Sequence, residues 1–222
     1  MDDLIISALY TYPIKSFRGI SLTSTKIEAR GLLHDRRWML IDQHNRFISQ
    51  REVAILSRFL VQINDHSLTV TFNEEQKIIP FLSDVEINSN TAELVQIWGD
   101  TCPAIVYTDE INNWFSKIIG VQSRLVYMPE SSIRQVDLQY APEGQITAFS
   151  DGYPILILGQ ESMNNLNSLL SMPISINRFR PNIVFTGGFP HIEDTFQKIR
   201  INSVLLECVK PSRRCNVPNI NQ

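Results

Sequence analysis

Cys215 is the residue of this sequence whose neighbours most directly suggest chemistry. It follows Arg213 and Arg214 in the stretch KPSRRCNVPNI, residues 210–220. Neighbouring guanidinium groups favour the thiolate form of a cysteine, and a thiolate is both a nucleophile and a soft metal ligand. The stretch therefore predicts a reactive or metal-binding cysteine. The alternative interpretation is a small residue beside a solvated basic turn, because motifs of this length are weak.

Further basic segments lie at turns and at the ends of expected strands. They contribute Lys15, Ser16 and Arg18 in YPIKSFRG, Arg36 and Arg37 in GLLHDRRWML, Arg51 in SQRE, and Arg178, Arg180 and Asn182 in NRFRPNIVF. Arginine offers phosphate a fixed fork of donors and lysine offers a point charge. We therefore predict that Lys15, Arg36, Arg180 and Arg214 line one cleft for a polyanionic ligand. The alternative is that each arginine pairs with a nearby acid such as Asp35.

The composition is that of an ordinary folded protein. Of the 222 residues, 43% are hydrophobic and 19% charged, and the net charge of −3 argues against a nucleic-acid partner. The start MDDLIISALYTYPIKS lacks the features of a signal peptide, and the apolar run PILILG has only strand length, so we expect no membrane association. Three cysteines without zinc-like spacing favour a reducing cytoplasm.

The elements that must position these residues are mainly strands. Short β-branched or alternating runs separated by polar turns predict a barrel or sandwich in the first half; they are LIISALYTYPIKS, STKIEA, RWMLID, RFIS, SLTVTF and AELVQIW. The spacing of apolar residues predicts helices in TDEINNWFSKIIG and ESMNNLNSLL. Further strands are expected in SRLVYM, PILILG, NIVFTG and SVLLECV. We place a division at residue 107, between a β-barrel-like module (1–107) and a β-rich second half (108–222), packed together.

Taken in order, these motifs resemble the MOSC-domain family, named after the C-terminal domain of molybdenum cofactor sulfurase. YPIKSFRGI, GLLHDRRWMLID and RFISQRE look like its N-terminal β-barrel module. FSDGYPILILGQESMNNLN, NRFRPNIVFTGG and CVKPSRRCNVPNI look like parts of the MOSC domain. The resemblance covers essentially the whole chain. The sequence looks most like two-module bacterial proteins akin to the mitochondrial amidoxime-reducing component. It implies an α+β fold that is mainly β, with the barrel-like module packed on a MOSC domain.

The resemblance also implies a cofactor and its ligands. In the family a molybdenum–molybdopterin cofactor lies in a basic cleft, with one cysteine on the metal, and the matching residue is Cys215. The residues that match cofactor contacts are Lys15, Ser16, Arg36, Asp151, Arg180, Asn182 and Arg214. Pyridoxal phosphate binding is a further possibility at the level of the family.

Three departures bear on this transfer. Ser212 stands where some relatives have a first cysteine, and DGYP replaces the DTSP of relatives. Relatives also continue beyond the motif around Cys215, so we expect a MOSC domain truncated at its C-terminal end, and an unfinished site would weaken retention of the cofactor. We expect no iron–sulfur module, because three cysteines are too few to hold such a cluster alone. We therefore expect a separate electron-donor protein of the ferredoxin or flavoprotein type.

Three functions remain open from the sequence. The first is a molybdenum-cofactor oxidoreductase that reduces N-hydroxylated or other N–O small molecules, with Cys215 as the catalytic metal ligand. The second is a sulfur carrier that holds a persulfide on Cys215. The third is a non-enzymatic module that binds phosphorylated ligands. Trp98 and Trp114 are expected in the core.

Overall fold

The protein is described by a computed structural model that covers residues 3–89 and 91–221. The strands of this part of the chain are β1 (Ile5–Thr11), β2 (Ile20–Leu22), β3 (Ile27–Glu28), β4 (Gly31–Leu32), β5 (Trp38–Ile41), β6 (Leu60–Ile63), β7 (Ser67–Phe72), β8 (Glu75–Pro80), β9 (Glu93–Ile97), β10 (Asp100–Val106), β11 (Arg124–Tyr127), β12 (Ile157–Gly159), β13 (Ile183–Thr186), β14 (Lys198–Ile201) and β15 (Val204–Glu207). The α-helices in it are α1 (Asp84–Ser89), α2 (Asp109–Ile119) and α3 (Gln160–Ser168). Short 3₁₀ helices are η1 (Ala54–Arg58), η2 (Ile176–Phe179), η3 (Ile192–Thr195) and η4 (Val217–Asn219). The predicted mainly β fold with a few helices is confirmed.

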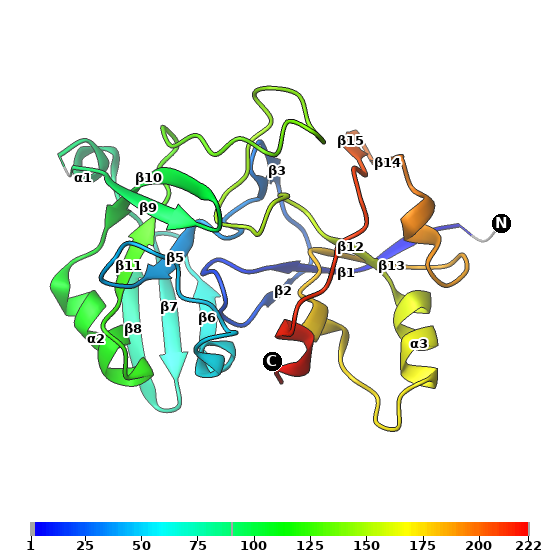
Figure 1. The fold of residues 1–222 in the computed structure, drawn as a ribbon, viewed down its shortest axis with the longest axis horizontal. Coiled ribbons are helices and arrows are strands. Elements are labelled where there is room, and N and C mark those ends of the chain that lie inside the picture. The colour runs from blue at the N-terminus through cyan, green and yellow to red at the C-terminus, as the bar shows by residue number, and fades with distance from the viewer. Residues whose placement is uncertain (1–2, 90, 222) are drawn as a thin grey trace.

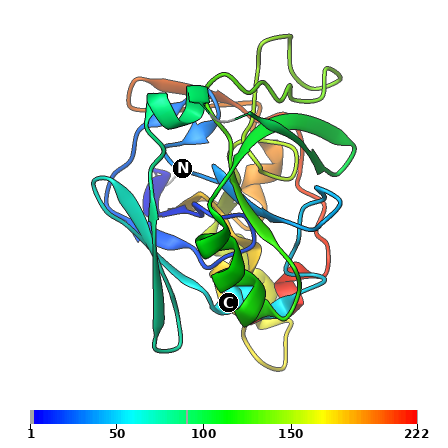
Figure 2. The ribbon, with the colours of Figure 1, turned by 90° about the vertical axis from the view of Figure 1, so that its left-hand side faces the viewer.

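The strands form two larger groups. In one, β5–β11–β10–β9 and β6–β7–β8 curl around a common core that also holds α2. In the other, β12–β13–β1–β2 form a sheet, with β12 parallel to β13 and β1 antiparallel to it. Figure 1 shows the first group at the left and the second, with α3 and the hairpin β14–β15, at the right. Figure 2, viewed from the left-hand end, has the green helix α2 in front.

Helix α2 shows how an apolar stripe fixes an element on the core. Ile111, Phe115 and Ile119 recur at every fourth position and are buried, as an amphipathic helix requires. Gly120 ends the helix with a left-handed backbone (φ 69°), and its N–H donates to the carbonyl of Ser116. The predicted helix is therefore confirmed and ends at this glycine, whereas the Thr108 side chain at its start makes no capping hydrogen bond.

The chain crosses between the two groups more than once. Strands β1 and β2 belong to the second group, β5 to β11 belong to the first, and β12 and β13 belong to the second again. The core residues Ile111 and Leu125 pack with Leu68, which belongs to β7. The division at residue 107 stays a prediction, and α2 and β11 share a core with strands that precede it.

Two sequence-based expectations were wrong in detail. RFIS forms two isolated bridges, Phe47 with Ile41 and Arg46 with Gln96, instead of a strand. Leu169 and Leu170, which belong to the predicted helix ESMNNLNSLL, follow the end of α3 and are 77% and 39% exposed. The helix therefore ends before its apolar pattern does.

Two buried apolar side chains anchor the turn after β1 to the core. Ile14 and Phe17 are fully buried, and the Phe17 ring stacks on Phe59 with centroids 4.7 Å apart. Because burying a Phe contributes several kcal/mol relative to Ala, the turn has little freedom to move. Lys15 and Ser16, between these two anchors, are thereby held in one position.

Candidate functional site

Several loops that carry the predicted site residues meet at one end of the β12–β13–β1–β2 sheet. Leu9 near the end of β1 pairs with Ile183 at the start of β13, and Ile157 at the start of β12 pairs with the same residue. The segments after β1, before β13 and before β12 therefore lie together. The Tyr10 N–H donates to the carbonyl of Asn182 over 2.9 Å and fixes the register at this end.

Asp35 is the hub of the hydrogen bonds between these segments. Its carboxylate is 2% exposed and accepts bonds from the Tyr12 N–H (2.8 Å) and from Asn182 Nδ2 (3.1 Å). The other carboxylate oxygen forms an ion pair with Arg36. Asn182 Oδ1 in turn accepts from Arg36 Nη1 at 3.0 Å. Asp35 and Asn182 thus lock the orientation of Arg36.

Arg36 and Arg180 both lie on the ring of Tyr12. Their guanidinium carbons are 4.4 and 4.3 Å from the ring centroid, distances typical of cation–π contacts. The Tyr12 ring is 1% exposed, and its hydroxyl donates to the carbonyl of Pro181 at 3.0 Å. Arg180 Nη1 also donates to the carbonyl of Phe17 at 2.7 Å. Both arginines are therefore held against the same ring.

Burial and the neighbouring charges shift the pKa values of these groups. Burial lowers the pKa of Arg180 to about 10, and the nearby Arg36 acts in the same direction. Burial also raises the pKa of Tyr12 to about 12, against the effect of the two arginines. Burial acts against the charged form of Arg36 as well, but Asp35 raises its pKa above the ordinary value. A negatively charged ligand would relieve the cost of keeping these cations together.

Lys15 reaches the same region from the turn after β1. Its ammonium donates to the carbonyl of Phe149 at 2.9 Å and pairs with Asp151 at 2.6 Å. Burial lowers the pKa of Lys15, although Asp151 opposes this effect. Desolvation acts to raise the pKa of Asp151, yet the ammonium of Lys15 and the Trp98 N–H lower it below its ordinary value. The Asp151 side chain is itself 72% exposed.

Three of the predicted site residues have a left-handed backbone, which is uncommon for residues other than glycine. The φ angles are 72° at Ser16, 50° at Arg36 and 55° at Arg180. Such conformations cost energy and gather at functional sites, where the surrounding structure enforces them. Here they occur in three separate loops, beside Lys15 in one and at the two arginines on the Tyr12 ring in the others.

Trp98 is a site residue that sequence reasoning placed wrongly. It was expected in the core, but it is 39% exposed and donates from Nε1 to Asp151 at 3.2 Å. Its ring packs on Phe47 at 4.8 Å, and the Arg51 guanidinium lies 4.1 Å from its centroid. Trp98 lies in the turn between β9 and β10 with a left-handed backbone (φ 55°), a position that no periodicity rule reveals.

Arg134 is a second residue that the sequence did not single out. It is 4% exposed, and its Nη1 donates to the carbonyls of Ala148 (2.9 Å) and Ser150 (2.6 Å). These bonds fix the loop that carries Asp151. Arg37, by contrast, faces away from Arg36 and pairs with Glu130 at 2.6 Å, so it has a structural role.

Arg214 and Cys215 approach the cluster from the C-terminal segment. Arg214 Nη2 donates to the carbonyl of Phe179 at 2.6 Å, and its guanidinium lies 5.2 Å from the ring of that residue. Arg214 is close enough to Arg36, Tyr12 and Asp151 to interact with their charges. Cys215 is exposed. The structure therefore brings Lys15, Arg36, Asp151, Arg180, Asn182 and Arg214 close together, and Ser16 and Cys215 are the chain neighbours of Lys15 and Arg214.

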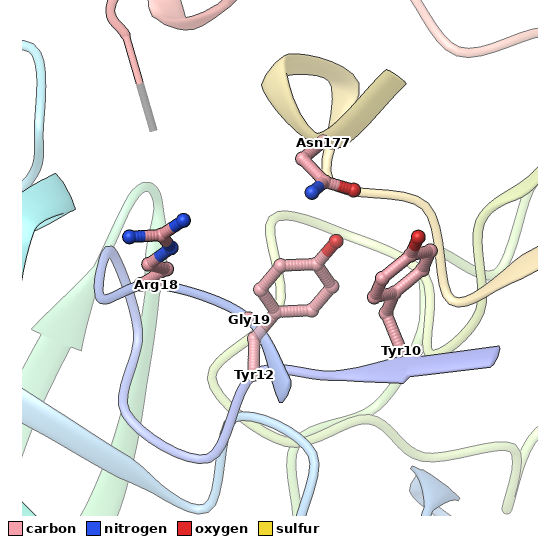
Figure 3. A pocket seen from close by; sticks show the side chains of 5 residues that line it. All are labelled: Tyr10, Tyr12, Arg18, Gly19 and Asn177. Atoms are coloured by element: carbon pink, nitrogen blue, oxygen red, sulfur yellow. The ribbon is translucent and has the colours of Figure 1, made fainter. Parts of the chain in front are cut away.

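A small pocket lies on another side of Tyr12. It is lined by Tyr10, Tyr12, Arg18, Gly19 and Asn177, and its volume is about 10 Å³ (Figure 3). That volume is close to the space of a single water molecule. This pocket is therefore too small for a large ligand.

The protein groups alone do not form a metal site of the usual kind. Within residues 3–89 and 91–221, no three His, Cys, Asp or Glu side chains are grouped so as to hold a metal ion. A metal at Cys215 would thus need most of its ligands from another molecule. No helix in the part of the chain that the structure describes has the length and apolar character needed to cross a membrane.

Comparisons with known proteins agree with this architecture. Residues 4–122 match the MOSC N-terminal beta barrel domain, and residues 144–222 match the MOSC domain. The chain is 27% identical to molybdenum cofactor sulfurase of Oryza sativa subsp. japonica, over 100% of this chain and 29% of that protein. It is 28% identical to mitochondrial amidoxime-reducing component 1 of Mus musculus and 26% to that of Homo sapiens, over 97% of this chain in both cases.

The chain belongs to the MOSC family, with both the N-terminal barrel domain and the MOSC domain. It spans 65% of the length of the mouse relative and 66% of the human one. The relatives are thus named for two activities, sulfuration of the molybdenum cofactor and reduction of amidoximes.

Proposed function

We propose that this protein binds a molybdenum–molybdopterin cofactor and reduces N-hydroxylated or other N–O small molecules with electrons from a separate donor protein. The observation that carries the proposal is the gathering of Lys15, Arg36, Arg180 and Arg214 at one end of a sheet, beside an exposed cysteine. The names of the relatives supply the cofactor and the substrate class.

The donors in the cluster fit the chemistry of such a cofactor. Four cations face two carboxylates, Asp35 and Asp151, so these six groups carry an excess of positive charge suited to a phosphate. Burial lowers the pKa of both Lys15 and Arg180, as expected for cations removed from water, and a bound anion would offset part of that cost. A bound cofactor would bring its own metal ligands and leave one position for a soft thiolate.

Each residue then has a defined task. Arg36, Arg180 and Arg214 would hold the anionic end of the cofactor, with Arg36 oriented by Asp35 and Asn182. Lys15 and Ser16 would contact it from the turn after β1, and Asp151 would hold Lys15 in place. Cys215 would ligate the metal, and the bound group would supply two-electron redox chemistry. Trp98, exposed beside Asp151, would form part of the wall against which a substrate lies.

A sulfur carrier is the second candidate. Two observations favour it: Cys215 is exposed, and one relative is named molybdenum cofactor sulfurase. In that case Cys215 would bear a persulfide, and the basic cluster would bind the acceptor.

One set of measurements on purified protein separates these candidates. The full chain is produced in a host that makes the molybdenum cofactor, and molybdenum, pterin fluorescence and cyanide-labile sulfur are measured per chain. Molybdenum with pterin, lost in Cys215→Ser, together with reduction of an amidoxime by a chemical electron donor, supports the reductase. Cyanide-labile sulfur on Cys215 without bound metal supports the carrier and contradicts the reductase.

A further inference from the structure

Lys210, five residues before Cys215, lies in a corner formed by two tyrosine rings. Its Nζ is 4.1 Å from the ring centroid of Tyr140 and 5.0 Å from that of Tyr153. The two rings stand at 84° to each other with centroids 6.1 Å apart. A ring face attracts a cation, so two such faces at right angles form a receptor for an ammonium group. Tyr153 also raises the pKa of Lys210 above its ordinary value.

The corner connects two parts of the proposed site. Tyr153 comes two residues after Asp151, the partner of Lys15, and Lys210 opens the segment that carries Cys215. On the other side of Cys215, Arg178 donates to the carbonyl of Pro218 and to Asn221 Oδ1, both at 3.3 Å. The Ser57 hydroxyl donates to the carbonyl of Asn221 at 3.0 Å.

The segment around Cys215 is therefore attached at both ends and exposed in the middle. Residues 211–216 are exposed and form no strand or helix. Within them, Arg214 reaches back to the carbonyl of Phe179 at 2.6 Å. Figure 1 shows this red segment running from β15 to the described end of the chain. Where Cys215 stands thus depends on attachments outside its own turn.

We propose that Tyr140 and Tyr153 form an aromatic latch for Lys210, and that the latch positions the Cys215 segment against the basic cluster. The three residues are positioning residues, because they act through the segment and do not themselves contact Arg36 or Arg180. Exposed cation–π contacts are individually weak, so the latch opens and closes readily. Its opening gives a large anionic ligand a way to reach the cluster beside Arg214. This role in ligand entry rests on the proposed function.

Trypsin measures the latch directly, because it cuts after Arg213 and Arg214 whereas the bond between Lys210 and Pro211 resists it. On cofactor-free full-length protein, we expect Lys210→Met and Tyr140→Leu to speed cleavage at these arginines by about two- to fivefold, the range of one cation–π contact. Lys210→Arg and Tyr140→Phe keep the cation or the ring face and should retain the wild-type rate. Thermal unfolding of all four variants should stay unchanged, which separates a latch from a general loss of structure.

Lys198→Met is the matched control. Lys198 is an exposed lysine of the neighbouring hairpin, paired with Glu207 at 3.0 Å, and it has no ring contact among those described. Its replacement removes the same charge and should leave cleavage unaltered. Wild-type cleavage rates in both Lys210→Met and Tyr140→Leu would overturn the latch.

Retention of molybdenum on desalting supplies the second readout. Latch variants loaded with cofactor should lose molybdenum several-fold faster than wild type and Lys198→Met. Equal retention would overturn the link between the latch and the site. If the wild-type protein binds neither molybdenum nor pterin while the latch variants are still cut faster, the proposed function fails and the latch stands.

Discussion

Asp35 and Asn182, 147 positions apart in the sequence, are joined by a hydrogen bond of 3.1 Å from Asn182 Nδ2 to the Asp35 carboxylate. Both residues are almost fully buried, and both also contact Arg36. A buried carboxylate that accepts bonds from several segments holds those segments in one relative position. The hydrogen bond is thus what converts two distant basic motifs into one site.

Removing the hub should destabilise the fold. Asp35→Ala leaves the guanidinium of Arg36, whose side chain is 13% exposed, without its ion-pair partner. Breaking a buried pair from one side costs about 3–5 kcal/mol. We expect a loss of that size in the free energy of unfolding, measured in urea. Glu207→Gln, which removes an exposed pair with Lys198, should cost less than about 1 kcal/mol. Equal losses in the two variants would contradict the role of Asp35.

Most residues of this candidate site could be predicted from the sequence, but their arrangement in space could not. The basic motifs around Lys15, Arg36, Arg180 and Arg214 were recognisable because arginine and lysine beside turn residues form readable patterns. Asp35 was noticed only as a possible ion-pair partner. Its role depends on pairing between β1 and β13, which is a long-range property without a local pattern.

The fold, like the site, could be predicted from the sequence only in part. Local signals predicted α2 and the alternating strand β7, because both depend on nearby residues. Trp98 was misplaced, since a large aromatic residue is usually buried, whereas this one lies partly exposed in a left-handed turn. Strand β10 was also missed; it contains Pro103, which weakens a strand pattern.

Arg180 should matter for cofactor retention far more than Arg46. Arg180 lies on Tyr12 in the basic cluster, whereas the Arg46 side chain is 62% exposed and pairs with Asp42 in a turn. Losing a charge-assisted donor to a buried anion costs about 1.5–3 kcal/mol, or roughly tenfold to hundredfold in affinity. Molybdenum per chain after dilution and desalting measures this loss for Arg180→Ala and Arg46→Ala. Comparable retention in the two variants would remove Arg180 from the proposed site.

His34 should make stability depend on pH near neutrality. Burial lowers its pKa, with the ring packed 5.1 Å from that of Phe81. Between the ordinary value of about 6.5 and the lower folded value, the unfolded chain binds more protons, so stability falls as the pH falls through this window. Its contribution is complete above about pH 6.5.

The matching variant is His34→Asn, because asparagine tolerates the left-handed backbone (φ 63°) at this position. Urea unfolding between about pH 5 and 8 should show a flatter profile in this variant than in wild type. His44→Asn changes an exposed histidine in a turn and should leave the wild-type profile in place. A profile that His34→Asn does not flatten would show that burial of this ring is not coupled to protonation.

Cys215 and the other two cysteines should separate chemistry from stability. Cys215 is exposed, and Cys208 is half-buried with its pKa raised by burial. Cys102 is 1% exposed in a cluster of apolar residues from β5, β9, β10 and β11. Iodoacetamide followed by mass spectrometry of the cofactor-free protein should therefore modify Cys215 first and Cys102 last.

Cys215→Ser should unfold at the wild-type urea concentration but retain no molybdenum, because a hydroxyl does not replace a soft thiolate. Cys102→Ser should retain molybdenum and lose about 1–3 kcal/mol of stability, the cost of a buried hydroxyl without an assured partner. Bound cofactor should also protect Cys215 from alkylation. If the Cys215→Ser protein retains molybdenum as the wild type does, Cys215 is only a surface residue beside a basic turn.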